Sequence, residues 1–143
     1  MNVHLMKLAV GVEDVDHLAR LQRQRSADFQ ARGLSPQPRH FTRMTPKRVA
    51  ELLDGGSMYW VIKGVIRVRQ LLLAFDRYTD EHGVKRCAIV LHPGLVATQN
   101  RPQRAFQGWR YLDPAKAPED ASGGGGDGLP VDLARELDAL GLL

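Results

Sequence analysis

The segment from Met58 to Ala74 constrains the fold more than any other part of the chain, because its apolar residues fall mainly on alternate positions. Successive side chains of a β-strand point to opposite faces, so a period of two predicts extended structure with one buried face. The even-numbered apolar residues are expected to form the core face: Met58, Trp60, Ile62, Ile66, Val68 and Leu72. The odd-numbered residues are expected to form an exposed face: Tyr59, Lys63, Arg67 and Arg69. A bulge at Gly64 would change the register between Lys63 and the two arginines.

Shorter elements are predicted on both sides of this segment. The stretch from Glu13 to Arg32 has apolar residues at spacings of three and four and ends before Gly33, which predicts a helix. Thr45 and Pro46 are typical of a helix start, and a second, short helix is expected over 46–53. Strands are expected over 3–10, 39–44, 84–91 and 107–111, with a loop over 98–104. Together these elements predict an α+β fold, in which two helices flank a small, curved or closed β-barrel.

The composition changes after residue 112. Residues 113–128 combine prolines, acidic residues and a run of glycines, which predicts a flexible linker. Residues 129–143 predict a short amphipathic C-terminal helix, with Leu133, Leu137 and Leu140 on one side. That helix is expected either to dock on the domain or to bind a protein partner. A chain of 143 residues is expected to contain one domain, here over 1–112, followed by these two segments.

Positive charge is concentrated in residues 36–110, which contain 13 basic and 5 acidic side chains and so have a net charge of +8. The flanking residues 1–35 and 111–143 have net charges of +1 and −5, which gives +4 for the whole chain. A cationic block of this kind is typical either of a solvated surface or of a surface that binds a polyanion.

Several other classes of protein are disfavoured. The longest apolar run, Leu71 to Phe75, is far shorter than the ~20 residues that span a bilayer, and no secretory signal pattern begins the chain. A cytoplasmic protein without a membrane partner is therefore expected. The single cysteine, Cys87, lies in an apolar run and is expected in the core. The histidines are scattered without metal-binding spacing and no phosphate-binding glycine loop is present, so neither a metal nor a cofactor is expected.

Two residues are retained as catalytic candidates. His40 lies between Arg39 and Arg43, whose charges favour the neutral imidazole that a general base requires. Ser57 follows a glycine turn but lacks the second glycine of a nucleophile elbow. A small hydrolytic or nucleolytic enzyme with His40 as its base is therefore the alternative function, although no positioned acid or nucleophile is evident.

The cationic block also contains aromatic and amide side chains. Arginine and lysine neutralise phosphates, aromatic rings stack on bases, and glutamine hydrogen-bonds a base edge. We therefore expect a binding module for RNA or a nucleotide-like anion. The residues expected to bind it are Arg43, Lys47, Arg48, Tyr59, Lys63, Arg67, Arg69, Gln70, Gln107, Trp109 and Arg110. The competing interpretation is that Trp60 and Trp109 are core residues and that the arginines are solvated at the edge of the sheet.

Several motifs resemble those of an uncharacterised bacterial family of small proteins, a domain of unknown function. They are Thr42-Arg43-Met44, Pro46-Lys47-Arg48, Glu51 to Ser57, Tyr59 to Gly64, Val68-Arg69-Gln70 and Gln107 to Leu112. The resemblance covers about residues 1–120 and implies no activity. The layout of Pro46 to Lys63 is also loosely similar to the PUA-like superfamily, including ASCH and EVE domains, which would imply a small barrel associated with RNA or modified nucleotides.

Overall fold

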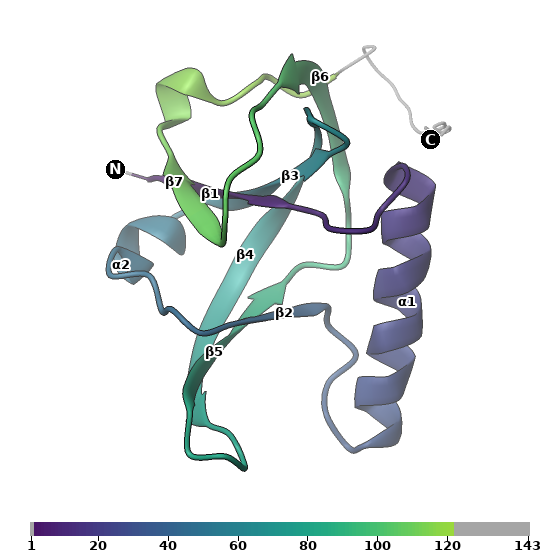
Figure 1. Ribbon diagram of the computed structural model, residues 1–143, viewed down its shortest axis with the longest axis vertical. Helices are drawn as coiled ribbons and strands as arrows, with labels where there is room; N and C mark the ends of the chain where they lie inside the picture. Colours follow the sequence, from purple (N-terminus) through teal and green to yellow (C-terminus); the bar gives the residue numbers. More distant parts are fainter. Residues whose placement is uncertain (1, 122–143) are drawn as a thin grey trace.

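The structure, a computed structural model, describes residues 2–121 of the chain. Its elements follow in the order β1 (His4–Leu8), α1 (Val15–Ala31), β2 (Arg39–Thr42), α2 (Val49–Leu52), β3 (Ser57–Ile62), β4 (Val65–Thr79), β5 (Lys85–Leu91), β6 (Val96–Pro102), β7 (Trp109–Leu112) and a 3-10 helix (Pro114–Lys116) (Figure 1). None of the helices in this part of the chain has the length and apolar character needed to cross a membrane.

The strands form one mixed, open sheet. Its order is β2-β5-β4-β3-β1-β7, and β6 pairs with β4. The pairing of β1 with β3 is parallel and the other pairings are antiparallel. β2 and β7 end the order and do not pair with each other within residues 2–121. The α+β class is therefore confirmed, but the expected closed barrel is replaced by an open sheet.

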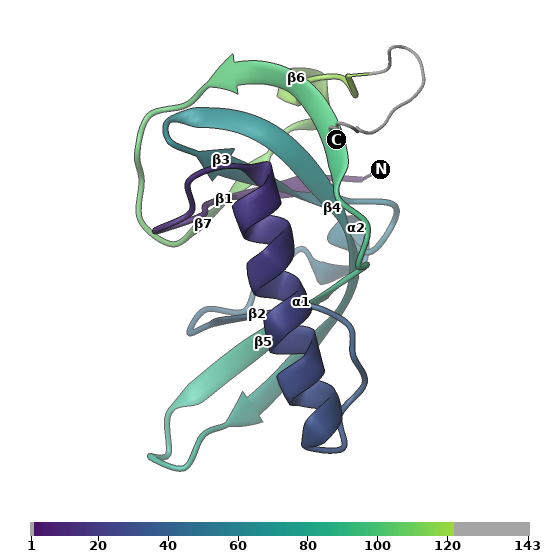
Figure 2. The same cartoon turned by 90° about the vertical axis from the view of Figure 1, so that its right-hand side faces the viewer.

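The long strand β4 bends and joins the two parts of this sheet (Figure 2). Its first half pairs with β3 and β6, and its second half pairs with β5. The loop expected over 98–104 is mostly strand β6, because β4 offers it a second edge.

A hairpin interrupts the segment that was predicted as one strand. Lys63 and Gly64 connect β3 to β4 with φ angles of 50° and 78°, which is the geometry of a two-residue type I′ turn. The predicted bulge at Gly64 is therefore a turn. The register shifts farther along, where Trp60 opposes Val68 and Val61 opposes Ile66, which leaves Arg67 as the additional residue.

Local sequence signals explain both ends of helix α1 but not the start of helix α2. Asp14 caps α1 by accepting a hydrogen bond from the His17 backbone N–H at 2.8 Å, and Gly33 follows the helix with φ 83°. The helix α2 is only four residues long and is preceded by Arg48, so Thr45 is not its N-cap. Beyond α2 the chain passes so close to β1 that a Cβ atom on Gly56 would collide with backbone carbonyls.

The core has two parts, one on each face of the sheet. The larger contains Trp60, Met58 and Ile62 of β3 together with Leu18 of α1 and Leu52 of α2. The smaller contains Tyr59 and Val61 of β3 with Met6, Ile66 and Leu112. Every residue of β3 is buried, so both faces of this central strand are covered. The prediction that Tyr59 is exposed is therefore wrong, since only 4 % of Tyr59 is accessible.

The domain continues beyond residue 112. The Gln99 backbone N–H donates to the Glu119 carbonyl at 2.8 Å, and that of Ala121 donates to the Ala97 carbonyl at 2.9 Å. Residues 113–121 thus pack along β6 instead of beginning a linker. The remainder of the expected linker, 122–128, and the expected helix over 129–143 lie outside the described residues.

Candidate anion-binding pocket

A pocket lies between the end of β1, helix α1 and strand β2, which border the same region in Figure 1. Its volume is about 160 Å³. Apolar side chains make up much of its wall: Ala9, Val12, Leu18, Leu21, Trp60 and Leu91. A cavity of roughly 150 Å³ holds a benzene-sized ring, so this pocket accommodates one ring or one small charged group.

Three cationic residues, Lys7, Arg25 and Arg39, also line the pocket, and no acidic residue does. Arg39 precedes His40 on β2, so its side chain points to the other face of the strand, where its guanidinium lies over the Phe29 ring. Within residues 2–121 none of the three forms a salt bridge. Arg39 donates instead to the carbonyl oxygens of Ser35 and Gln37, at 2.8 and 3.2 Å. Burial lowers the pKa of Lys7, because the charged ammonium group loses hydration there. The pocket therefore favours an anion electrostatically.

His40 lies at the inner wall of this pocket. Its ring contacts Trp60 edge to face, with centroids 5.6 Å apart. Burial, followed by the charges of Lys7 and Arg25, lowers its pKa to about 4. The neutral form expected from the sequence thus has a different main cause, because desolvation outweighs the neighbouring cations. The Nε2 atom is buried from solvent and has no hydrogen-bond partner among the described residues, so it is an unsatisfied polar atom beside the pocket.

Gln70 and Gln22 form a hydrogen-bonded pair that contacts Trp60, one of the residues that line the pocket. The Trp60 Nε1–H donates to Oε1 of Gln70 at 3.1 Å, and Gln70 and Gln22 exchange hydrogen bonds at 2.8 and 2.9 Å. Gln70 also donates to the His92 carbonyl at 2.8 Å and is completely buried. The prediction that Gln70 lies on the ligand surface is therefore wrong, and its position is that of a residue that orients Trp60.

Part of the predicted site is brought together beside Lys7. Trp109 lies opposite Lys7 in the β1–β7 pairing and donates from Nε1 to the Met44 carbonyl at 3.1 Å. Tyr111, two residues farther along, accepts from the backbone N–H groups of Lys47 and Arg48 at 2.9 and 3.2 Å.

These hydrogen bonds hold the segment 44–48 against β7, outside the lining of the pocket. Arg43 and Lys47 are exposed, whereas Arg48 pairs with Glu51 at 2.6 Å. Trp109 is half-buried against the larger core and does not line the pocket.

Other predicted site residues lie elsewhere. Lys63 is at the tip of the β3–β4 hairpin and pairs with Glu13 at 2.6 Å. Arg110 lies over the Phe106 ring at 5.2 Å, on the opposite face of β7 from Trp109. Gln107 is exposed just before β7, and Arg67 is the half-buried residue of the β4 bulge.

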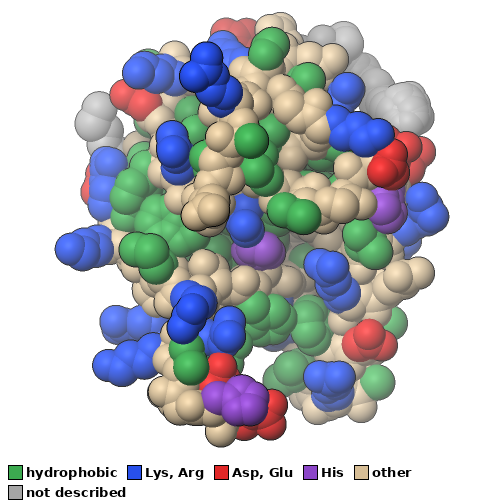
Figure 3. Space-filling view, viewed as in Figure 1, with side chains coloured by type: hydrophobic (Ala, Val, Ile, Leu, Met, Phe, Trp, Pro, Cys, Tyr) green, Lys and Arg blue, Asp and Glu red, His purple; other side chains and the backbone are tan. Residues whose placement is uncertain are grey.

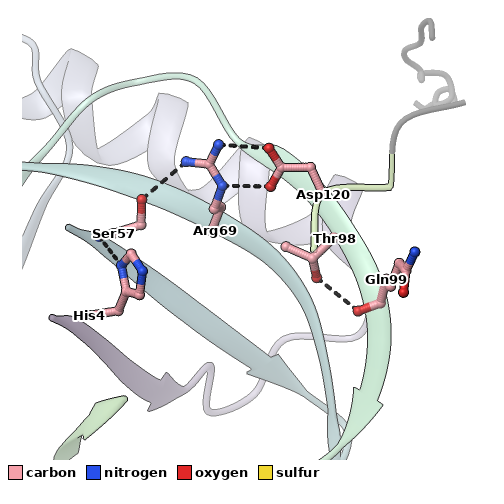
Figure 4. Close-up of polar contacts among 6 residues, drawn as sticks. All are labelled: His4, Ser57, Arg69, Thr98, Gln99 and Asp120. Atoms are coloured by element: carbon pink, nitrogen blue, oxygen red, sulfur yellow. Dashed lines mark hydrogen bonds and ion pairs between the residues drawn. The ribbon is translucent and has the colours of Figure 1, made fainter. Parts of the chain in front are cut away.

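Arg69 and Ser57 form a separate polar cluster on the face of the smaller core (Figure 4). Both oxygens of Asp120 accept from Arg69, at 2.7 and 2.8 Å, and Arg69 also donates to Ser57 Oγ at 3.1 Å. His4 accepts through Nδ1 from the Ser57 backbone N–H at 3.0 Å and not from its hydroxyl. Ser57 is buried and has no base at its hydroxyl in this cluster, so the geometry does not favour it as a nucleophile.

Figure 3 shows Lys and Arg side chains spread around exposed hydrophobic side chains on one face, with carboxylates mainly toward the outline of the molecule. Among the described residues no cluster of three or more His, Cys, Asp or Glu side chains could hold a metal ion.

The sequence interpretation missed Lys7 and Arg25. Both occupy positions that the periodicity assigns to the core: Lys7 shares its face of β1 with Val3 and Leu5, and Arg25 follows Leu18 and Leu21 on α1. The sequence signal for both residues was a charged side chain at a position within an apolar stripe.

The comparisons with known proteins identify the family of this chain. Neither the curated proteins nor the solved structures contain a match to this chain. Residues 5–143 match the protein family described as "Protein of unknown function (DUF1489)", which covers almost the whole chain. The chain therefore belongs to the DUF1489 family, as its motifs indicated.

Proposed function

We propose that this protein binds RNA or a nucleotide-like anion at the pocket between β1, α1 and β2. One observation carries the proposal: the pocket is lined by Lys7, Arg25 and Arg39 without a carboxylate, beside a buried His40 nitrogen that has no partner in the described structure. Cations without carboxylates favour a phosphate, and the unsatisfied imidazole nitrogen gains a partner from a ligand group that reaches it.

The size of the pocket limits what enters it. Drug-sized ligands occupy roughly 300–1,000 Å³, whereas this pocket has about 160 Å³. It therefore holds one part of a nucleotide, either a base ring or a phosphate. The rest of the ligand extends outside the pocket, and the exposed cations Arg43 and Lys47 are the residues that we propose contact it.

The alternative is a hydrolytic or nucleolytic enzyme with His40 as the base. A pKa of about 4 keeps the imidazole neutral at pH 7 but also makes it a weak general base, because an efficient base has a pKa near the working pH. The other candidate, Ser57, belongs to the separate cluster around Arg69, and the lining of the pocket provides no serine, cysteine or carboxylate. Binding therefore requires only residues that line the pocket, whereas catalysis requires a nucleophile or an acid that its lining does not contain.

Fluorescence anisotropy with labelled, mixed-sequence RNA at several salt concentrations tests the proposal. Lys7→Ala and Arg25→Ala should each weaken binding and reduce the slope of log affinity against log salt by roughly 1. Arg20→Ala is the matched control, because Arg20 is exposed on the same helix as Arg25 but does not line the pocket. Absent binding, binding that is insensitive to salt, or binding that Lys7→Ala and Arg25→Ala weaken no more than Arg20→Ala does would refute the proposal.

A further inference from the structure

A row of partly exposed aromatic rings lies on the face of β2 opposite the pocket. Phe41 of β2 contacts Tyr78 of β4 and Phe29 of α1 edge to face, with centroids 6.3 and 6.0 Å apart. Phe41 is 44 % exposed and Tyr78 38 %. Each of the two residues leaves more than a third of its surface open to solvent, which core packing alone does not explain.

The strand register places these rings on one face. Phe41 opposes Ala88 of β5, which opposes Asp76 of β4, and Tyr78 follows Asp76 by two residues. Phe41 and Tyr78 therefore point to the same side of the sheet. His40, the neighbour of Phe41, points to the other side, into the pocket.

Arg39 connects the pocket to the aromatic row. It lines the pocket, and its guanidinium lies over the Phe29 ring at 5.2 Å. Arg43 follows Phe41 by two residues, is exposed and forms no salt bridge within residues 2–121. The central ring of the row is thus flanked along the chain by two arginines without carboxylate partners.

We propose that the aromatic row, Phe29, Phe41 and Tyr78, stacks bases of single-stranded RNA whose adjoining nucleotide occupies the pocket. The inference rests on the proposed function and narrows the ligand from a nucleotide-like anion to a single strand of several nucleotides. Aromatic faces stack on any unpaired base, and arginines beside them neutralise the backbone. Bases in a duplex are already stacked on one another, so a double strand does not satisfy this surface.

The test compares binding of labelled RNAs by anisotropy. Single strands of one, three and eight nucleotides and a duplex of eight base pairs are titrated into the full-length chain and into the variants Phe41→Leu and Tyr78→Leu. Affinity should rise with single-strand length and exceed that for the duplex. Each leucine variant should lose about 5- to 150-fold in affinity for the octamer, the range for removal of one stacked base.

Two further variants separate stacking from general surface effects. Tyr78→Phe retains the ring and should bind the octamer as the natural protein does. Val96→Ala alters another exposed apolar residue, on β6, and should also leave binding unchanged. Melting temperatures of the variants establish that each is folded, and the exposure of Phe41 and Tyr78 predicts small changes.

The outcomes distinguish this inference from the proposed function. Octamer binding that Lys7→Ala weakens but both leucine variants leave unchanged would overturn the aromatic site and retain the pocket. Equal affinity for one and eight nucleotides would do the same. If the leucine variants change the sedimentation of the protein and not its affinity for RNA, the aromatic row is a contact between copies of the chain and the inference is wrong. Absent binding of every RNA would overturn both.

Discussion

Removing the titration of His40 should flatten the pH dependence of stability between pH 6.5 and 4. The perturbation is His40→Phe, which keeps a ring against Trp60 and removes the ionisable group. It also removes the buried Nε2 atom that has no partner in the described structure. Stability at pH 7 is therefore expected to stay within about 1 kcal/mol of the natural protein, because lost polar contacts are few.

The expected magnitude follows from the pKa difference. In the unfolded chain the histidine has its ordinary pKa of 6.5, and in the folded protein its pKa is about 4. Above pH 6.5 both states are neutral and the full stability is present. As the pH falls from 6.5 to 4, the unfolded state binds a proton that the folded state does not, so the free energy of unfolding decreases. At about 1.4 kcal/mol per pKa unit, the loss is at most about 3.5 kcal/mol.

Urea unfolding followed by circular dichroism at half-unit steps from pH 7.5 to 3.5 measures this loss. The difference between the natural protein and His40→Phe isolates the histidine, because carboxylates titrate in both. His82→Gln is the matched control, since that side chain is 80 % exposed in a turn. Parallel pH profiles for the natural protein and His40→Phe would refute the reasoning, and so would an NMR titration that gives His40 a pKa near 6.5.

Two substitutions test the supports of the pocket by chemical denaturation. Gln70→Leu should lower the free energy of unfolding by roughly 2–4 kcal/mol, because it leaves the buried Trp60 Nε1–H and the His92 carbonyl without their partner. A loss below about 1 kcal/mol would mean that the hydrogen bonds of Gln70 contribute little to stability. Gly56→Ala should cost more than about 2 kcal/mol, because its Cβ would collide with the Leu52 carbonyl, and unchanged stability would show that the backbone can move apart there.

The elements with strong local signals were predictable from the sequence. Helix α1 lies within the predicted range, since its apolar spacing and the glycine after its end agree. Strand β2 begins at Arg39 as predicted, and β5 ends at Leu91. Strand β6 was not predicted, because Val96–Pro102 is largely exposed and polar and becomes a strand through its pairing with β4.

The faces of β3 and β4 were harder to assign, for a physical reason. Alternation identifies the core only when one face of a strand is solvated. Here the smaller core covers the second face of β3, so Tyr59 is buried although its position is odd. The turn at Lys63 and the bulge at Arg67 then separate the basic residues that a single regular strand would have kept together. Lys63 and Arg69 instead neutralise Glu13 and Asp120.

The residues that line the pocket suggest a more useful rule than the total charge of a segment. Burying a cation costs free energy unless an opposite charge or hydrogen bonds compensate for it. A lysine in the inward stripe of a strand therefore predicts a cavity that a polar ligand or solvent can enter. Lys7 satisfies this condition, and Arg25 lines the same pocket but is exposed. Both lie outside the block of highest charge, 36–110, whereas several arginines inside that block are already paired. The position of a charge relative to the apolar pattern thus identifies the candidate site better than the local density of charge.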